Sequence, residues 1–251
     1  MLSESPVNFS GRWDEWFIIS FNAEAKAVAA GDYLKAGWRA YDMGWVHSLR
    51  RQADDVMTCA RRAATHWKSA KAGASLDANA NRLLGNGYEL KKEYLVALAT
   101  YQEALNSERS VSEESKEVAA TLNDIAGIKR RTGDIDGAMI DGREALRIAL
   151  VLDDTYGVAL YTGNIASLAL DQDDWLLAES FAREALTLAD QIGSFELIAD
   201  DNQRLAIALI RQGKAEEAVP YAQRAVDIFK RLGSPCLENT NQTLRECEEQ
   251  P

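Results

Sequence analysis

The sequence has few of the side chains from which most catalytic and metal sites are built. Its 251 residues include only two histidines, His47 and His66, and three cysteines. It contains no Gly-x-x-x-x-Gly-Lys-Ser/Thr phosphate loop, no His-Glu-x-x-His pair and no Gly-x-Ser-x-Gly elbow. These absences argue against nucleotide hydrolysis, zinc proteolysis and serine hydrolase chemistry. We therefore expect a protein that is not an enzyme and that has no cofactor and no metal site.

Two weaker patterns have structural alternatives that we favour. Cys59 and His66 are two helical turns apart and could share a helix face as a nucleophile pair or metal site, but packing explains both. The run from Asp171 to Asp174 resembles a calcium loop, yet it lacks the glycine and the distal glutamate of such a loop. The three cysteines form no Cys-x-x-Cys pair, so we interpret them as reduced thiols of a cytosolic protein.

The chain also has no long apolar run. No segment approaches the roughly 20 apolar residues needed to span a bilayer, and the first ten residues lack a basic region followed by an apolar one. The formal net charge is −11, and phosphate contacts need clustered Lys and Arg, so general nucleic-acid binding is disfavoured. We expect a cytoplasmic protein with neither a membrane nor a nucleic acid as partner.

An alanine pair that recurs along the chain is the strongest positive signal. Ala138 and Ala145 are seven residues apart, and steps of 40 or 41 residues in either direction reach a similar pair each time. The other pairs are Ala178 and Ala185, Ala218 and Ala225, Ala97 and Ala104, Val56 and Ala63, and Trp16 and Ala23. Such a period marks stacked units, none of which buries its apolar face alone.

Each unit is predicted to hold two helices of about 17 residues. In the second helices apolar and small residues recur at helical spacing, as at Tyr94, Ala97 and Tyr101. In the first helices a bulky residue precedes a small one, as at Leu84-Gly85, so that a partner helix approaches closely. Turn glycines such as Gly133 supply left-handed backbone, and Ser194 and Ser234 are candidate N-caps.

These units define one elongated domain over residues 1–251. The predicted divisions are a half-repeat at 1–31, five repeats at 32–72, 73–112, 113–153, 154–193 and 194–233, and a capping helix with an acidic tail at 234–251. The chain thus begins in mid-repeat. Either the first ten residues form a poor cap or the polypeptide is a fragment of a longer protein, and we favour the fragment.

The repeat resembles the tetratricopeptide repeat. The best match is Leu84-Gly85-Asn86-Gly87-Tyr88 followed by Tyr94, Ala97, Tyr101 and Ala104-Leu105, and the resemblance covers about residues 11 to 232. The period is similar to the long-helix repeats of kinesin light chains and of sensor arrays in bacterial signal-transduction ATPases and transcription activators. The pattern departs where small residues replace its second aromatic, at Ala60, Gly142, Ala182 and Ala222.

The resemblance implies an all-α fold, a right-handed α-solenoid of tandem antiparallel helix pairs. It also implies that the first helices line a concave groove that holds a peptide or a partner helix. Carried over one unit at a time, the groove residues are Trp38, Tyr41, Trp45, Arg82, Asn86, Glu89, Asn123, Arg130, Arg131, Asp171, Gln203 and Arg211. The alternative is that the tryptophans only pack and the arginines form a solvated face.

Two functions follow from this interpretation. The first is a non-catalytic protein-interaction scaffold or sensor module that binds a peptide or partner protein in the groove, where Asn amides hold a backbone and Arg forks hold carboxylates. The second is self-association as a homodimer through the incomplete N-terminal tier, where Trp13, Trp16 and Phe17 lack a first helix to pack against.

Overall fold

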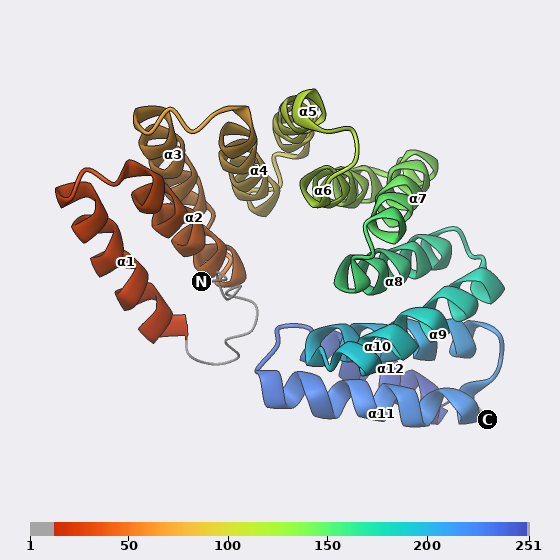
Figure 1. Cartoon of the computed structure of the whole chain (residues 1–251). Coiled ribbons are helices and arrows are strands. Elements are labelled where there is room, and N and C mark those ends of the chain that lie inside the picture. Colours follow the sequence, from red (N-terminus) through yellow and green to blue (C-terminus); the bar gives the residue numbers. More distant parts are fainter. Residues whose placement is uncertain (1–12, 250–251) are drawn as a thin grey trace. The chain divides into compact units, whose positions relative to one another are not determined.

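The computed structural model describes the backbone of residues 13–249 and the side chains of residues 18–249, and every regular element in this range is an α-helix (Figure 1). The all-α prediction is confirmed. The helices are α1 (Trp13–Ala29), α2 (Tyr33–Leu49), α3 (Ala53–Ser69), α4 (Ala74–Leu90), α5 (Tyr94–Val111), α6 (Lys116–Thr132), α7 (Ile135–Val151), α8 (Thr155–Asp171), α9 (Trp175–Ile192), α10 (Phe195–Arg211), α11 (Ala215–Leu232) and α12 (Leu237–Glu249).

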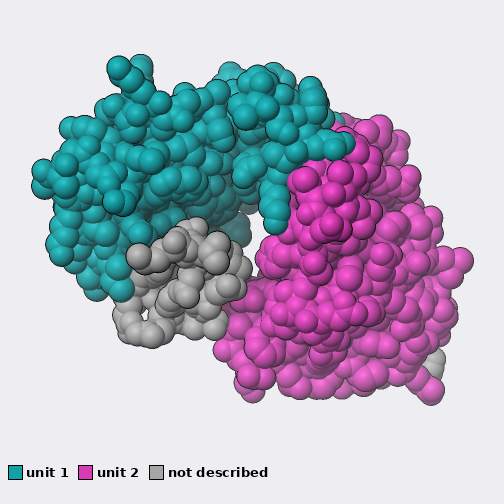
Figure 2. Space-filling view, viewed as in Figure 1, with its two compact units in different colours: residues 1–132 teal, residues 133–251 magenta. Residues whose placement is uncertain are grey.

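The chain divides into two compact units, residues 1–132 and residues 133–251 (Figure 2). In unit 1 each helix from α1 to α6 packs against the next, and α2, α4 and α6 also contact one another in turn. In unit 2 the helices α7 to α12 pack in the same way, with α8, α10 and α12 in turn. Stacked helix pairs of this kind form an α-solenoid. The single domain over 1–251 stays a prediction.

The recurring alanines lie at the centre of the helix pairs. Ala97, Ala104, Ala138 and Ala145 have no exposed surface, and the same holds for the equivalent residues of the other repeats from Val56 to Ala225. At these buried positions a small side chain lets the paired helices approach closely. Ala23, the earliest alanine of the series, is only partly buried in α1.

Glycines in the first helices allow the closest approaches. A Cβ on Gly85 in α4 would lie 2.7 Å from the Tyr101 ring of α5, and one on Gly44 in α2 would overlap Leu83 of α4. Both contacts are closer than a real side chain tolerates. The predicted pairing of a small residue with a close neighbour is confirmed at these two positions.

The turns share a residue with left-handed backbone, and at only some of them is that residue glycine. Gly133 and Gly213 have φ of +88° and +74°, as predicted for left-handed turns after a first helix. At the equivalent turns of other repeats the left-handed residue is not glycine. It is Arg51, Lys92 or Asp173, with φ of 58°, 63° and 58°. An L-residue pays about 1–2 kcal/mol for this conformation, so the turn geometry is imposed by the packing of the helices.

Ser194 is an N-cap, as predicted. Its hydroxyl accepts a hydrogen bond from the backbone N–H of Leu197 at 3.5 Å in the first turn of α10. Asp134 and Asp174 do the same for α7 and α9 at 3.0 Å. Each cap satisfies one of the N–H groups that the first helical turn leaves without a partner.

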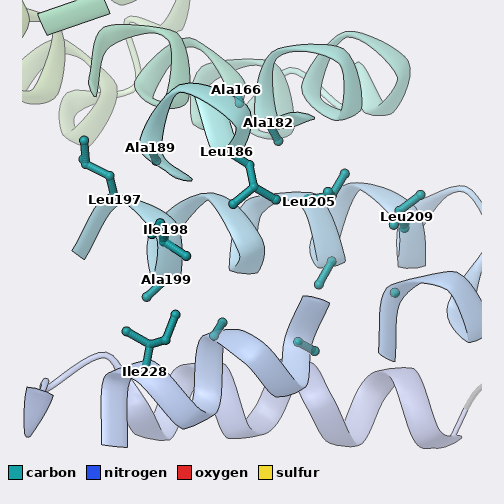
Figure 3. Close-up of a cluster of buried hydrophobic side chains, with 14 of the residues drawn as sticks. Ala166, Ala182, Leu186, Ala189, Leu197, Ile198, Ala199, Leu205, Leu209 and Ile228 are labelled. Atoms are coloured by element: carbon teal, nitrogen blue, oxygen red, sulfur yellow. The ribbon is translucent and has the colours of Figure 1, made fainter. Parts of the chain in front are cut away.

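The largest buried cluster lies in unit 2 (Figure 3). Figure 3 shows Leu186 of α9 on one side of α10, near Leu205, and Ile228 of α11 on the other side of α10. Cys247 of α12 is 3% exposed within the same cluster. Burying one Leu or Ile contributes about 1.5–3 kcal/mol, so this cluster outweighs any single surface ion pair.

Candidate functional site

An aromatic cluster marks the beginning of unit 1's series of first helices. Trp38, Tyr41 and Trp45 lie on one side of α2, and Trp67 of α3 packs beneath them without any exposed surface. The Trp38 ring is 5.2 Å from Trp67 and 5.7 Å from Tyr41, and Tyr41 is 6.1 Å from Trp45, mostly edge to face. Trp38 itself remains 39% exposed. The cluster therefore combines a packed base with an accessible indole.

Arg82 of α4 joins this cluster to the next first helix. Its guanidinium lies over the Trp45 ring at 5.5 Å, and its Nε donates to Asp124 Oδ2 of α6 at 2.6 Å. Burial alone would lower the pKa of the Arg82 guanidinium, but Asp124 more than offsets it and raises that pKa. Arg82 is thus held charged and oriented by an aromatic face and a carboxylate.

Glu89 forms a second link between α4 and α6. Its carboxylate accepts from the Tyr101 hydroxyl at 3.2 Å and pairs with Arg131 at 3.2 Å. Burial raises the pKa of Glu89 above its usual value, although Arg131 acts in the opposite direction. Arg131 is about half exposed and Glu89 about one-fifth exposed. This ion pair is open to an incoming charged group.

Asn86 lies between Arg82 and Glu89 on α4, one helical turn from the first and three residues from the second. Its Oδ1 atom is buried and has no hydrogen-bond partner within the described residues. An acceptor in this state costs about 1–3 kcal/mol unless a donor reaches it. Asn86 is therefore the residue of this face that most needs a ligand or a water.

The other predicted residues of α6 lie along the same helix. Asn123 is partly buried, and Arg130 is exposed beside Arg131 at the end of the helix. In unit 1 contacts join the aromatic residues of α2 to Arg82 of α4, and Glu89 of α4 to Arg131 of α6. We use the name first-helix face of unit 1 for the predicted residues on these three helices, which are Trp38, Tyr41, Trp45, Arg82, Asn86, Glu89, Asn123, Arg130 and Arg131.

Unit 2 does not gather its predicted residues in the same way. Asp171 and Arg211 are exposed at the ends of α8 and α10, whereas Gln203 is only 9% exposed. The central position of α8 is Gly163, where a Cβ would overlap Asp201 and come within 2.7 Å of Arg204. Side chains of α10 therefore cover this part of α8.

Arg204, which links α10 to α8, was not among the residues predicted from the sequence. Arg204 donates to Ser167 at 2.8 Å and Asn164 at 3.1 Å on α8, and to Asp201 at 2.6 Å on its own helix. Asp201 has no exposed surface, and its burial raises the pKa of its carboxyl to about 6. The available signal was the Asp201–Arg204 spacing of three residues opposite a glycine in the preceding first helix.

The weak catalytic candidates have ordinary surroundings. Cys59 is buried, which raises the pKa of its thiol to about 11, and His66 contacts Glu24 at 3.1 Å. Among residues 18–249 no three His, Cys, Asp or Glu side chains are placed to hold a metal ion. The three cysteines are free thiols. The side chains of Trp13, Trp16 and Phe17 lie outside the described residues, so self-association through them stays a prediction.

No described helix is long and apolar enough to cross a membrane. Fold and face together define a class of protein, an α-solenoid of helix pairs that repeat every 40 residues and carry mixed aromatic, amide and charged side chains on their first helices.

The family follows from comparison with known proteins. Two models described as tetratricopeptide repeat match residues 118–151 and 156–231. These two stretches therefore consist of tetratricopeptide repeats, as the sequence resemblance implied. No curated protein matches it significantly.

Solved structures share the fold at low identity. BtubC (BKLC) from P. vanneervenii has a TM-score of 0.71 and 19% identity over 88% of this chain and 92% of its own. A Rap protein complexed with competence and sporulation factor has a TM-score of 0.69 and 12% identity over 97% and 72%. A Podosopora anserina putative kinesin light chain with nearly identical TPR-like repeats has a TM-score of 0.57 and 10% identity over 76% and 94%. At these identities the likeness concerns the fold.

Proposed function

We propose that the chain is a non-catalytic scaffold that binds a peptide or an extended segment of a partner protein on the first-helix face of unit 1. The chemistry of the face supports this. Trp, Tyr and Arg are the side chains that contribute most to binding energy at protein interfaces, and here they lie next to one another on α2 and α4. The similarity to a Rap protein that was solved with a bound factor favours the same class of function.

The single observation that carries the proposal is the buried, unpartnered Oδ1 of Asn86 between two ion pairs. A peptide backbone presents N–H groups at regular intervals, and rotation of the Asn86 side chain toward the ligand would let one of them satisfy this acceptor. The peptide's own charged groups would meet Arg131 and Glu89, both of which keep solvent access. Trp38 would cover an apolar side chain of the same peptide.

The ion pairs also reduce the cost of binding. Arg82 is already held by Asp124 and the Trp45 ring, so little side-chain entropy remains to be lost there. The face is thus ordered before a ligand arrives.

The experiment is a selection followed by matched variants. A library of random dodecapeptides displayed on phage is selected against the immobilised full chain, and enriched peptides are titrated by fluorescence anisotropy. We expect Asn86→Ala, Trp38→Ala and Arg131→Ala each to weaken binding about tenfold. Arg61→Ala and Arg143→Ala, at exposed positions on α3 and α7, are the controls and should bind as the wild type does. Equal affinity of all five variants would show that the peptides bind elsewhere.

A further inference from the structure

A second surface lies at one edge of unit 2, away from the predicted groove positions. Here the loop after α7 and the loop after α9 lead into α8 and α10, and five large apolar side chains remain exposed. They are Leu150 and Val151 (56% each), Tyr156 (41%), Ile192 (37%) and Phe195 (50%). We call this set the loop-edge patch. Scattered exposed apolar residues are ordinary, but residues gathered at one edge indicate a contact surface.

A pocket borders this patch at Leu150. Its volume is about 170 Å³, and Leu150, Asp153, Thr155, Val158 and Leu188 line it. Apolar cavities of about 150 Å³ admit a benzene ring, so the pocket has room for one aliphatic or aromatic side chain. A partner that covers the patch would insert one apolar side chain here, in the manner of an anchor residue.

The charges around the patch define the partner further. Asp153 lines the pocket. Burial, and after it the carboxylates of Glu196, Asp200 and Asp154, raise the pKa of the Tyr156 hydroxyl. Arg231 lies over the Phe195 ring at 5.4 Å and is outnumbered by these carboxylates. The carboxylates of Asp153, Asp154, Glu196 and Asp200 therefore set the sign of the field at the patch, and this field favours cations.

We propose that the loop-edge patch binds a basic amphipathic helix of a partner protein. The apolar stripe of that helix covers Leu150, Tyr156 and Phe195, one of its side chains fills the pocket, and its Lys or Arg side chains pair with Asp153 and Glu196. The arrangement follows the general mode in which a helix lies in an apolar groove with charged residues at its border. This surface is independent of the peptide-binding function proposed for unit 1.

The test uses a fluorescein-labelled 14-residue helical peptide of Leu and Lys, with the Lys residues on one face, and a second peptide with Glu in place of Lys. Both are titrated against the full chain. We expect binding of the Leu/Lys peptide that weakens as salt increases, and no binding of the Leu/Glu peptide. The double variant Leu150→Ser, Phe195→Ser should weaken binding at least about tenfold.

Two controls keep the result specific. The double variant Leu95→Ser, Leu176→Ser removes apolar side chains that are more exposed (80% and 71%) but lie outside the patch, and it should bind as the wild type does. Asp153→Asn should reduce affinity several-fold and lessen the salt dependence. Asn tolerates left-handed backbone, and Asp153 has φ of 51°, so the turn is kept.

Hydrogen exchange locates the bound peptide. Protection confined to residues 147–158 and 188–197 supports the proposal. Equal affinity of the patch variant and the wild type, or protection elsewhere alone, would overturn it.

Discussion

The substitution Gly85→Ala tests whether the close helix approaches set the packing of unit 1. The new Cβ would lie 2.7, 2.8 and 3.1 Å from three atoms of the Tyr101 ring, which is 1% exposed and cannot swing into solvent. Overpacking of this kind costs about 1–3 kcal/mol. The gain in helix propensity from Gly to Ala offsets about 1 kcal/mol. We expect a net loss of roughly 0–2 kcal/mol in the free energy of unfolding, in contrast to the gain that helix propensity alone would give.

The measurement is thermal unfolding followed by circular dichroism, with Gly142→Ala as the matched control. Gly142 is also a buried helical glycine, but its added Cβ would lie 3.6 Å from Leu168 and 3.7 Å from Ile165, which is ordinary contact. This control should be more stable than the wild type by about 1 kcal/mol, a rise of about 2–4 °C in Tm. If Gly85→Ala raised Tm as much as Gly142→Ala does, the account of the close approach would be wrong.

Three further predictions concern buried charge and the turns. Burial raises the pKa of Glu108 to about 7, so the stability of the wild type should fall as pH rises from about 4.5 to about 8. In urea titrations the variant Glu108→Gln should be more stable than the wild type by roughly 1–3 kcal/mol at pH 8. At pH 4.5 the two proteins should have the same stability. Asp124→Ala should cost about 2–4 kcal/mol because it leaves Arg82 without its partner, and a double-mutant cycle with Arg82→Ala should recover part of that loss. At the turns, Gly133→Ala should lower the free energy of unfolding and Lys92→Gly should raise it, each by about 1 kcal/mol in a urea titration, because both residues have left-handed backbone.

Each of these three predictions has a result that would contradict it. A Glu108→Gln variant with the wild-type pH slope would place the titration on other carboxyls, such as Asp42, whose pKa burial raises to about 6. Additive losses at Arg82 and Asp124 would mean that the two side chains do not depend on each other. A Lys92→Gly variant less stable than the wild type would mean that the lysine side chain contributes more than the backbone strain costs.

Much of the fold follows from sequence because its main determinants are local and periodic. The alanine series, the glycine turn at Gly133 and the Ser194 cap each depend on one residue type at one spacing, and the structure places all three as predicted. The left-handed turns at Lys92 and Asp173 were not predicted. Lysine does not favour that backbone and aspartate only tolerates it, so the packing of the flanking helices specifies it.

The helices that carry the candidate site residues follow from the sequence, but the hydrogen-bond and ion-pair partners of those residues do not. The repeat register placed Arg82 and Arg131 on first helices, which follows from helical periodicity alone. The register did not identify Asp124 as the partner of Arg82, or Tyr101 as the residue that donates to Glu89. Such contacts depend on which side chains reach across from the next helix. For the same reason Arg204 and its contacts over α8 were missed.

The most direct test of the central claim uses the tryptophan indole N–H signals in a ¹⁵N NMR spectrum of the full chain. The sequence has six tryptophans, and single Trp→Phe variants assign their signals. When a dodecapeptide enriched in the selection is titrated in, we predict that the signals of Trp38 and Trp45 shift with the same apparent Kd as the anisotropy titration. The signal of Trp175, in α9, should stay in place. Unmoved Trp38 and Trp45 signals at saturating peptide would contradict the assignment of the first-helix face of unit 1 as the binding surface.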